Sequence, residues 1–231
     1  MSSIRPRVSG SHRAGLIRSN DVTTFEHAML GVNGALASGL QHRYGWRVAA
    51  FAGLAAITPD WDGLTIVGGM QLFDQAHRAW GHSFASCLLV AVLLVAFDTR
   101  FDLMGWGRRT LERLLDSKDK RIDPRPEPSA LRCAVWFWVA VLAMLSHLAA
   151  DLVYSGAEGL SDWELKLLWP FSQQGFVYPM VRWGDVGVTL IFVAGIFAML
   201  RWRRHVRAIA CGTLGCTIVY IAGRGGLNAA L

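Results

Sequence analysis

The chain has 231 residues, of which 53% are hydrophobic and only 17% are charged. An ordinary soluble domain has roughly 25% charged residues, so this composition excludes a disordered chain, a solvated coiled coil and a typical cytosolic enzyme. The net charge of +6 comes from 23 Lys/Arg and 17 Asp/Glu. Most of the basic residues fall between apolar segments, as they do in the cytoplasmic loops of helical membrane proteins.

The chain begins with a polar segment. Residues 1–24 carry four arginines but no apolar stretch before a small-residue cleavage site, so we expect a polar tail and not a cleaved signal peptide. The apolar segments that follow predict one helical membrane domain over residues 25–222, with a polar connector at 98–132. Residues 223–231 are expected to form a short C-terminal tail.

Six apolar runs occupy the domain, and they predict an all-α, multi-pass membrane protein of about four to six antiparallel helices. The first two are short and rich in Gly and Ala, which favours close helix packing. The other four approach or exceed the roughly 17–25 residues that a spanning helix needs. In chain order the runs are His27–Leu40, Gly45–Thr58, Trp80–Phe97, Leu131–Tyr154, Val186–Trp202 and His205–Ala222.

The polar connector holds nine Lys/Arg and seven Asp/Glu. The pattern over Arg108–Lys120 predicts a short surface helix, which the prolines after Asp123 would end. Acidic residues nearly balance the basic ones, and the interleaved aromatic residues of a single-strand binder are missing. We therefore expect no nucleic-acid partner.

The loops also predict an orientation. The loops 41–47, 98–132 and 201–207 together hold 15 Lys/Arg, whereas the segments of the opposite face hold 8. The positive-inside rule places the first face in the cytoplasm of a bacterial-type inner membrane, with the other face outward. The four arginines of the N-terminal tail conflict with this orientation unless the first two helices do not fully cross.

Histidine and aspartate side chains lie at the ends of the apolar runs, where ionisable residues are costly and often functional. In an up-and-down bundle these ends share one side, so we expect a metal or proton site at one end of the bundle. The side chains that would converge there are His27, Asp60, Asp62, His77, His82, His147, Asp151 and Asp185.

The residue types at this end suit a metal. His147 and Asp151 are one helical turn apart and lie on one face. Imidazole and carboxylate together are zinc ligands, and two neighbouring carboxylates such as Asp60 and Asp62 are able to bridge two ions. Each residue also has a structural alternative: His27 would pack at a helix start, and His147 with Asp151 would form a buried hydrogen-bonded pair.

The motifs occur in an order that resembles a known family. His27-xxx-Gly31, Pro59-Asp60-x-Asp62, His77-Arg78-xxx-His82-Ser83, His147-xxx-Asp151 and Leu168-Trp-Pro-Phe-Ser172 are similar to those of the YdjM-type inner-membrane-bound, metal-dependent hydrolases. The order of ligands is more distantly similar to zinc-dependent phospholipase C and S1/P1-type nucleases. Ala79 and Gly81 stand where the family pattern has Gly and Thr.

The resemblance implies hydrolysis of a phosphoester, such as a lipid headgroup or a lipid-linked substrate, with one to three divalent ions, zinc first among them. The implied metal ligands are His27, Asp60, His82, His147 and Asp151, with Asp62 and His77 as further ligands or as groups that orient them. Asp62 or Asp185 would be the general base, and Arg78 would pair with a phosphate or snorkel to the headgroups. Membrane lipid is thus the expected partner.

Four tryptophans lie near the same segments, namely Trp80, Trp163, Trp169 and Trp183. Indoles favour the membrane interface, so we expect them to form an interfacial belt.

Two other functions fit the sequence. An intramembrane His/Asp carrier of protons or cations requires polar side chains along a path across the bilayer. A non-enzymatic membrane scaffold requires a metal without an open coordination position. The sequence does not predict the oligomeric state.

Overall fold

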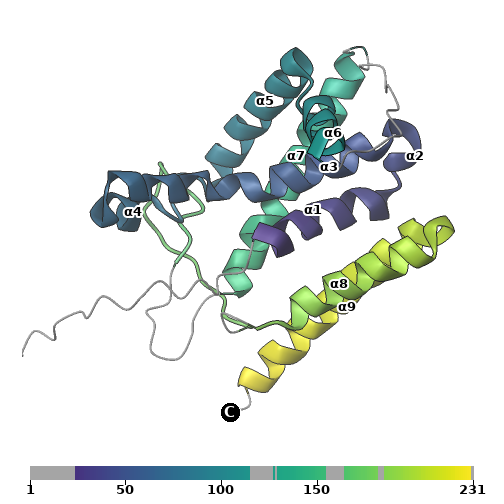
Figure 1. The fold of residues 1–231 in the computed structure, drawn as a ribbon. Coiled ribbons are helices and arrows are strands. Elements are labelled where there is room, and N and C mark those ends of the chain that lie inside the picture. Colours follow the sequence, from purple (N-terminus) through teal and green to yellow (C-terminus); the bar gives the residue numbers. More distant parts are fainter. Residues whose placement is uncertain (1–23, 115–126, 128, 155–163, 182–184, 230–231) are drawn as a thin grey trace, which may run out of the picture.

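The structure is a computed structural model that describes residues 24–114, 127, 129–154, 164–181 and 185–229. Nearly all of the predicted N-terminal tail, part of the polar connector, Trp163 and Trp183 lie outside these residues. The described elements are helical, as predicted (Figure 1). They are α1 (Thr24–Ser38), α2 (Gln41–Tyr44), α3 (Trp46–Ile57), the 3-10 segment η1 (Thr58–Gly68), α4 (Met70–Ala76), α5 (Phe84–Phe101), α6 (Leu103–Leu114), α7 (Ala130–Val153), α8 (Gly187–Arg201), η2 (Arg203–His205) and α9 (Val206–Ala229).

Helices α1 and α3 pack side by side, and α7 crosses them (Figure 1). Their contact depends on small side chains. A Cβ atom on Gly31 would lie 2.2 Å from the carbonyl oxygen of Ala52, and one on Gly53 would lie 2.8 Å from the Val32 side chain. The Gly/Ala pattern therefore lets the two backbones approach closely, as the sequence predicts.

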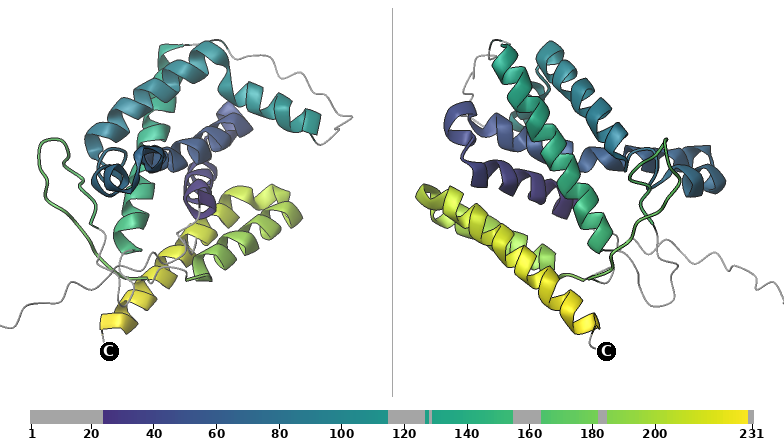
Figure 2. Two further views of the ribbon diagram at one scale, coloured as in Figure 1. Left: turned by 60° about the vertical axis from the view of Figure 1, so that its left-hand side comes forward. Right: turned by 180° about the vertical axis from the view of Figure 1, so that it is seen from behind.

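Three segments are long and apolar enough to cross a membrane: α5, α7 and the stretch Arg203–Gly226, which comprises η2 and most of α9. The hydroxyls of Ser83 and Ser129 cap α5 and α7 by accepting hydrogen bonds from the amides of Ser86 and Arg132, both at 3.2 Å. Helix α8 is apolar but shorter. Helices α8 and α9 form a hairpin that lies against α1 (Figure 2).

The segment between α3 and α5 differs from the prediction. The apolar run beginning at Trp80 was expected to be helical throughout, but α5 begins only at Phe84. Before it, Arg78 adopts a left-handed backbone (φ 61°) and Ser83 an extended one, so the chain turns sharply between α4 and α5. His77 consequently follows the end of α4 instead of opening the next helix.

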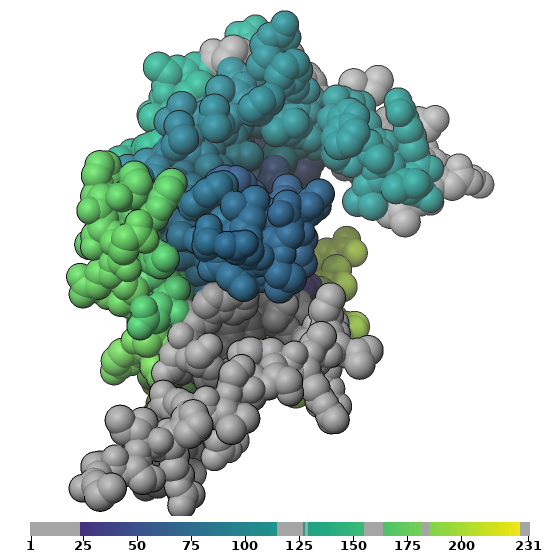
Figure 3. All heavy atoms as spheres, turned by 90° about the vertical axis from the view of Figure 1, so that its left-hand side faces the viewer, coloured from purple at the N-terminus to yellow at the C-terminus, as the bar shows by residue number. Residues whose placement is uncertain are grey.

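Residues 164–181 run in an extended path along this turn. Leu165 and Phe176 exchange two backbone hydrogen bonds, while the amides of Lys166 and Phe84 bond to the carbonyls of Arg78 and Leu167. Figure 3 shows this green segment lying against the blue residues of the η1–α4 region. It thus holds in place the turn that carries His82.

The predicted surface helix of the connector is α6, which begins at Leu103, five residues before the expected start. Asp102 adopts a left-handed backbone (φ 54°) that ends α5. The carboxylate of Asp98 then accepts a hydrogen bond from the Met104 amide at 3.1 Å, which fixes the start of α6.

Candidate metal centre

Four side chains from three parts of the fold meet at one end of the molecule, and we refer to them as the four-residue cluster. Asp60 comes from η1, His82 from the turn before α5, and His147 and Asp151 from the last turns of α7. The His82 Nε2 atom lies 3.1 Å from His147 Nε2, 3.1 Å from Asp151 Oδ2 and 3.4 Å from Asp60 Oδ1. His147 Nε2 lies 3.4 Å from each of the same two carboxylate oxygens.

These distances fit a tetrahedral ion site. Five of the six separations between the four atoms lie between 3.1 and 3.4 Å. A regular tetrahedron with edges of about 3.3 Å has its corners about 2.0 Å from its centre, which is the bond length of zinc to imidazole nitrogen and carboxylate oxygen. The four atoms are therefore spaced as the ligands of one small divalent cation would be.

Hydrogen bonds on the far side of each ring assign the imidazole tautomers. His147 Nδ1 lies 2.8 Å from the carbonyl oxygen of Ala56, which only accepts hydrogen bonds, so Nδ1 carries the proton. His82 Nδ1 donates in the same way to the carboxylate of Asp62 at 2.9 Å. When both rings are neutral, their Nε2 lone pairs point into the cluster, where a bound cation would accept both of them.

Asp62 orients His82 from behind the cluster. Its carboxylate is fully buried and accepts three hydrogen bonds: from His82 Nδ1, from His77 Nδ1 at 2.8 Å and from the Gly81 amide at 2.9 Å. Both oxygens are thereby occupied, so Asp62 is placed to position His82, and its predicted role as a general base stays a prediction. His77, Asp62 and His82 also satisfy the spacing of a possible ion site, which shares His82 with the cluster.

Gly81 has a steric reason to be glycine. A Cβ atom there would lie 1.9 Å from the carbonyl oxygen of Pro59 and 3.1 Å from the Asp62 carboxyl carbon. The backbone of the His82 turn thus contacts η1 directly at Gly81.

The electrostatics of the cluster favour positive charge. Burial alone would lower the pKa of His82, but hydrogen bonds to Asp151, Asp60 and Asp62 outweigh it and raise that pKa well above its usual value. Burial would raise the pKa values of Asp60 and Asp62, yet the facing histidines hold both below their usual range. The carboxylates therefore stay ionised and attract a cation.

His27 lies beside the cluster. Its ring stacks on His147 with centroids 3.8 Å apart, and its Nε2 atom is 3.3 Å from Asp151 Oδ1, the oxygen that faces away from the other ligand atoms. Its Nδ1 atom is buried and has no hydrogen-bond partner among the described residues. His27, which belongs to α1, therefore borders the site and contacts it through Asp151 of α7.

Two other predicted residues, Asp185 and Arg78, are not among the four side chains of the cluster. Asp185 accepts hydrogen bonds from Tyr220 at 2.5 Å, from Arg224 at 3.1 Å and from the Gly187 amide at 2.9 Å. Burial would raise the pKa of Asp185, but these partners hold it below its usual value. Arg78 is 2% exposed, and its contact with a phosphate stays a prediction.

The cluster is open on the Asp60 side. The Asp60 side chain is 40% exposed, whereas those of His82, His147 and Asp151 are at most 6% exposed. Next to it, three indoles form a row in which the Trp61–Trp80 and Trp80–Trp169 ring centroids are 6.5 and 6.3 Å apart. Asp60 is therefore the most exposed member of the cluster and lies closest to the indole row.

Sequence reasoning missed some groups that shape this site. The role of the Ala56 carbonyl could not be predicted, because every residue has a backbone carbonyl. Trp61 was overlooked because attention fell on Asp60 and Asp62 on either side of it. Gly81 was noted only as a departure from the family pattern, although a glycine beside a ligand histidine is itself a sign of close backbone packing.

Neither the curated proteins nor the solved structures contain a match to the chain. A family match does exist, and it covers residues 22–227, from just before α1 nearly to the end of α9. It includes every residue of the four-residue cluster, the flanking His27 and the apolar helices. The chain belongs to the YdjM family of inner membrane proteins.

Proposed function

We propose that the chain is a membrane-bound, metal-dependent hydrolase of a phosphoester, acting on a lipid headgroup or a lipid-linked substrate. The observation that supports it best is the four-residue cluster, which has a tetrahedral set of ligand atoms and one exposed member. A structural zinc site has four protein ligands and no open position, whereas a catalytic site keeps one position for water or substrate. Asp60, whose side chain is 40% exposed, is the ligand that would give up its position to water or substrate in a catalytic site. Zinc is the first ion to test.

A divalent cation held here would supply Lewis acidity and lower the pKa of a water molecule. The chain's own groups have separate tasks. His147 and His82 are held with Nε2 inward by Ala56 and Asp62, so the ligand atoms are positioned before any ion binds. Asp151 and Asp60 provide the negative charge, and Asp60 lies where a substrate would enter.

The surroundings of the opening support a substrate that lies in the membrane. Beside the indole row, η1 and the 164–181 segment expose apolar side chains: Leu64, Val67 and Phe171 are 72%, 88% and 89% exposed. Large exposed apolar side chains of this density mark a surface that meets lipid or a partner. A headgroup phosphate would then reach Asp60 without leaving the bilayer surface.

The two alternative functions have less support. A carrier needs titratable groups along the molecule, but the carboxylates at the opposite end bind Trp136 and arginine side chains instead of continuing the cluster. A purely structural metal would leave the exposure of Asp60 without a role.

The test uses the full chain purified in detergent. We expect about one zinc or other divalent ion per chain by elemental analysis, and hydrolysis of a chromogenic phosphodiester and of a short-chain phospholipid. Asp60→Asn should lower hydrolysis strongly, while Asp185→Asn should have little effect. Bound metal without hydrolysis of any phosphoester would contradict the enzymatic proposal, and absence of metal would contradict the site itself.

A further inference from the structure

Helix α6 has an apolar face that is largely exposed. On a helical wheel Leu103, Met104, Trp106, Leu111 and Leu114 share one face. Of these, Trp106, Leu111 and Leu114 are 62%, 55% and 77% exposed. Figure 3 shows α6 projecting from the body beyond α5. A short amphipathic helix with these properties is typical of one that lies in the plane of a membrane interface.

The apolar face of α6 borders a groove against α3. The groove has a volume of about 800 Å³, and its lining includes Trp46 and Leu54 of α3 and Leu103, Trp106 and Leu111 of α6. Arg108 is the charged residue in the lining. Such a volume is large enough for a sizeable apolar ligand with a single polar group.

Positive charge flanks the groove. Arg108 and Arg113 lie on either side of the apolar face of α6, whose other charged residues are Arg109 and Glu112. The carboxylate of Glu112 accepts a hydrogen bond from Arg108 Nε at 2.5 Å, so Arg108 carries part of the positive charge and Arg113 adds to it. Arg43, just before α3, is exposed as well. The nearby carboxylates of Asp98 and Asp102 are buried and bonded to Trp136, Arg47 and Arg109. The surface around the groove is therefore basic, which complements an anionic headgroup.

We propose that the α3–α6 groove binds an anionic phospholipid, with an acyl chain against Leu54, Leu103 and Leu111 and the phosphate beside Arg108. Arg113 adds positive charge on the other side of the apolar face. Helix α6 then lies at the headgroup level of the leaflet that the positive-inside rule assigns to the cytoplasm. This site lies at the end of the molecule away from the four-residue cluster, so it is independent of the proposed hydrolase activity.

The experiment measures lipid bound to the delipidated full chain in detergent by native mass spectrometry. Phosphatidylglycerol and phosphatidylcholine with identical acyl chains are compared, and thermal stabilisation by each lipid is recorded in parallel. We expect the wild type to favour phosphatidylglycerol by at least about fivefold, and Arg108→Gln and Arg113→Gln each to reduce that preference by about fivefold. Leu111→Glu should weaken the binding of both lipids, because it places a carboxylate in the groove.

Arg203→Gln is the matched control, since it removes one exposed positive charge in the α8–α9 connection without touching α6. It should keep the phosphatidylglycerol preference. Arg113 is exposed, so its variant tests the proposal even if Leu111→Glu fails to fold, which circular dichroism would reveal. Equal binding of the two lipids by the wild type would overturn the proposal, as would an equal effect of Arg203→Gln. A dimer that forms without lipid and that Leu111→Glu dissociates would also overturn the proposal, because the groove would then bind a second copy of the chain.

Discussion

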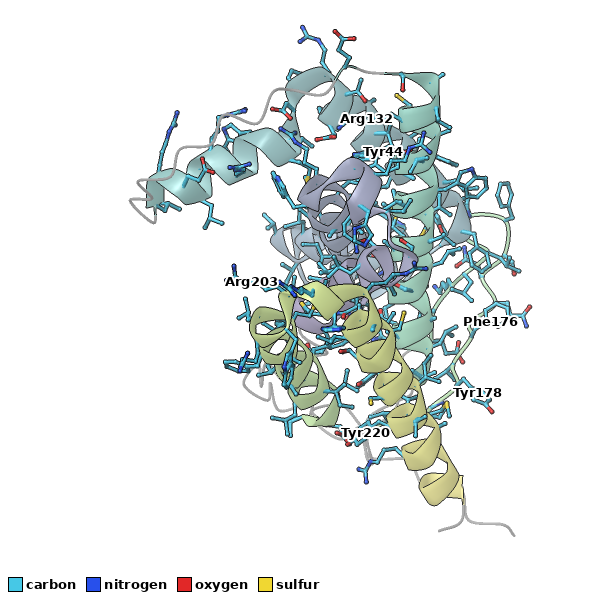
Figure 4. All side chains as sticks on the ribbon, turned by 90° about the vertical axis from the view of Figure 1, so that its right-hand side faces the viewer. Tyr44, Arg132, Phe176, Tyr178, Arg203 and Tyr220 are labelled. Carbon is cyan, nitrogen blue, oxygen red and sulfur yellow. The ribbon has the colours of Figure 1, made fainter. Side chains whose placement is uncertain are left out.

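Both ends of the molecule bury carboxylates, but the side chains that bond to them differ. At one end Asp151 and Asp62 face imidazoles. At the other, Asp102 accepts hydrogen bonds from Arg47 at 2.5 Å and Arg109 at 3.1 Å, and Asp98 accepts one from Trp136 at 3.2 Å. Figure 4 shows Arg132 and Tyr44 near this second end and Tyr220 far from it. We call it the arginine end.

The difference between the two ends decides which of them is able to bind a cation. Arginine is always protonated and only donates, so its carboxylate partners are already neutralised. A neutral imidazole presents a lone pair, and two lone pairs beside two carboxylates leave an electron-rich space. Burial of acidic groups alone therefore does not identify a metal site; the chemistry of their partners does.

The largest effect is expected at the arginine end. Arg47→Met leaves the buried Asp102 paired with Arg109, whose side chain is 52% exposed. Breaking a buried ion pair on one side costs about 3 kcal/mol or more, because the other charge stays desolvated. Chemical unfolding in detergent should show this loss, and Arg47→Met/Asp102→Leu should restore part of it. Unchanged stability in Arg47→Met would contradict the ion pair, and metal content should stay the same.

The second effect separates the ends by metal affinity. Asp151→Asn removes a ligand charge next to both His82 and His147, and we expect divalent-ion affinity to fall at least about 100-fold, which corresponds to about 2.7 kcal/mol. Competition with a chelating dye measures it. Asp102→Asn is the matched control, since it removes a buried carboxylate of the arginine end. Equal metal affinity in the two variants would remove the distinction drawn between the ends.

A smaller effect is expected from Asp62→Asn, which tests the orientation of His82. The amide fills the same space but no longer fixes the Nδ1 proton of His82, and loss of such a supporting residue lowers metal affinity about 10- to 100-fold. Asp74→Asn, on the exposed side of α4, is the control and should leave the affinity unchanged. If Asp62→Asn abolished binding as completely as Asp151→Asn, Asp62 would instead be a direct ligand.

Much of the helical fold was predictable from the sequence. The length of an apolar run indicates whether a helix is able to span a membrane, and the spacing of small residues indicates where two helices pack closely. The predicted apolar runs that end at Tyr154 and Trp202 end within about two residues of the last residues of α7 and α8. The turn from Thr58 to Ser83 was not predicted, because its shape depends on left-handed Arg78 and on the contact of Gly81 with Pro59. Such tertiary constraints leave no periodic pattern.

The convergence of helix ends placed Asp60, His82, His147 and Asp151 at one end of the bundle, and the structure brings them together. The same reasoning grouped Asp185 with these four residues. Asp185 lies just before α8 and accepts hydrogen bonds from Tyr220 and Arg224 of α9 instead. Nor did this reasoning reveal the pair of Arg47 and Asp102, which are 55 residues apart. An arginine inside an apolar run was the available signal, since it needs a buried partner.

The smallest effect concerns pH at the arginine end. Burial would raise the pKa of Asp102, but hydrogen bonds from Arg47 and Arg109 hold it below its usual value, so folding favours the ionised form. Its stabilising contribution is therefore fully present above the unfolded-state pKa of about 3.9 and is lost as the pH falls through the folded-state pKa. We expect the stability difference between wild type and Asp102→Asn to shrink by about 1 kcal/mol on acidification from pH 6 to pH 3. Thermal unfolding over this range measures it. A difference that stays constant would mean that packing of the side chain, and not its charge, stabilises the junction between α5 and α6.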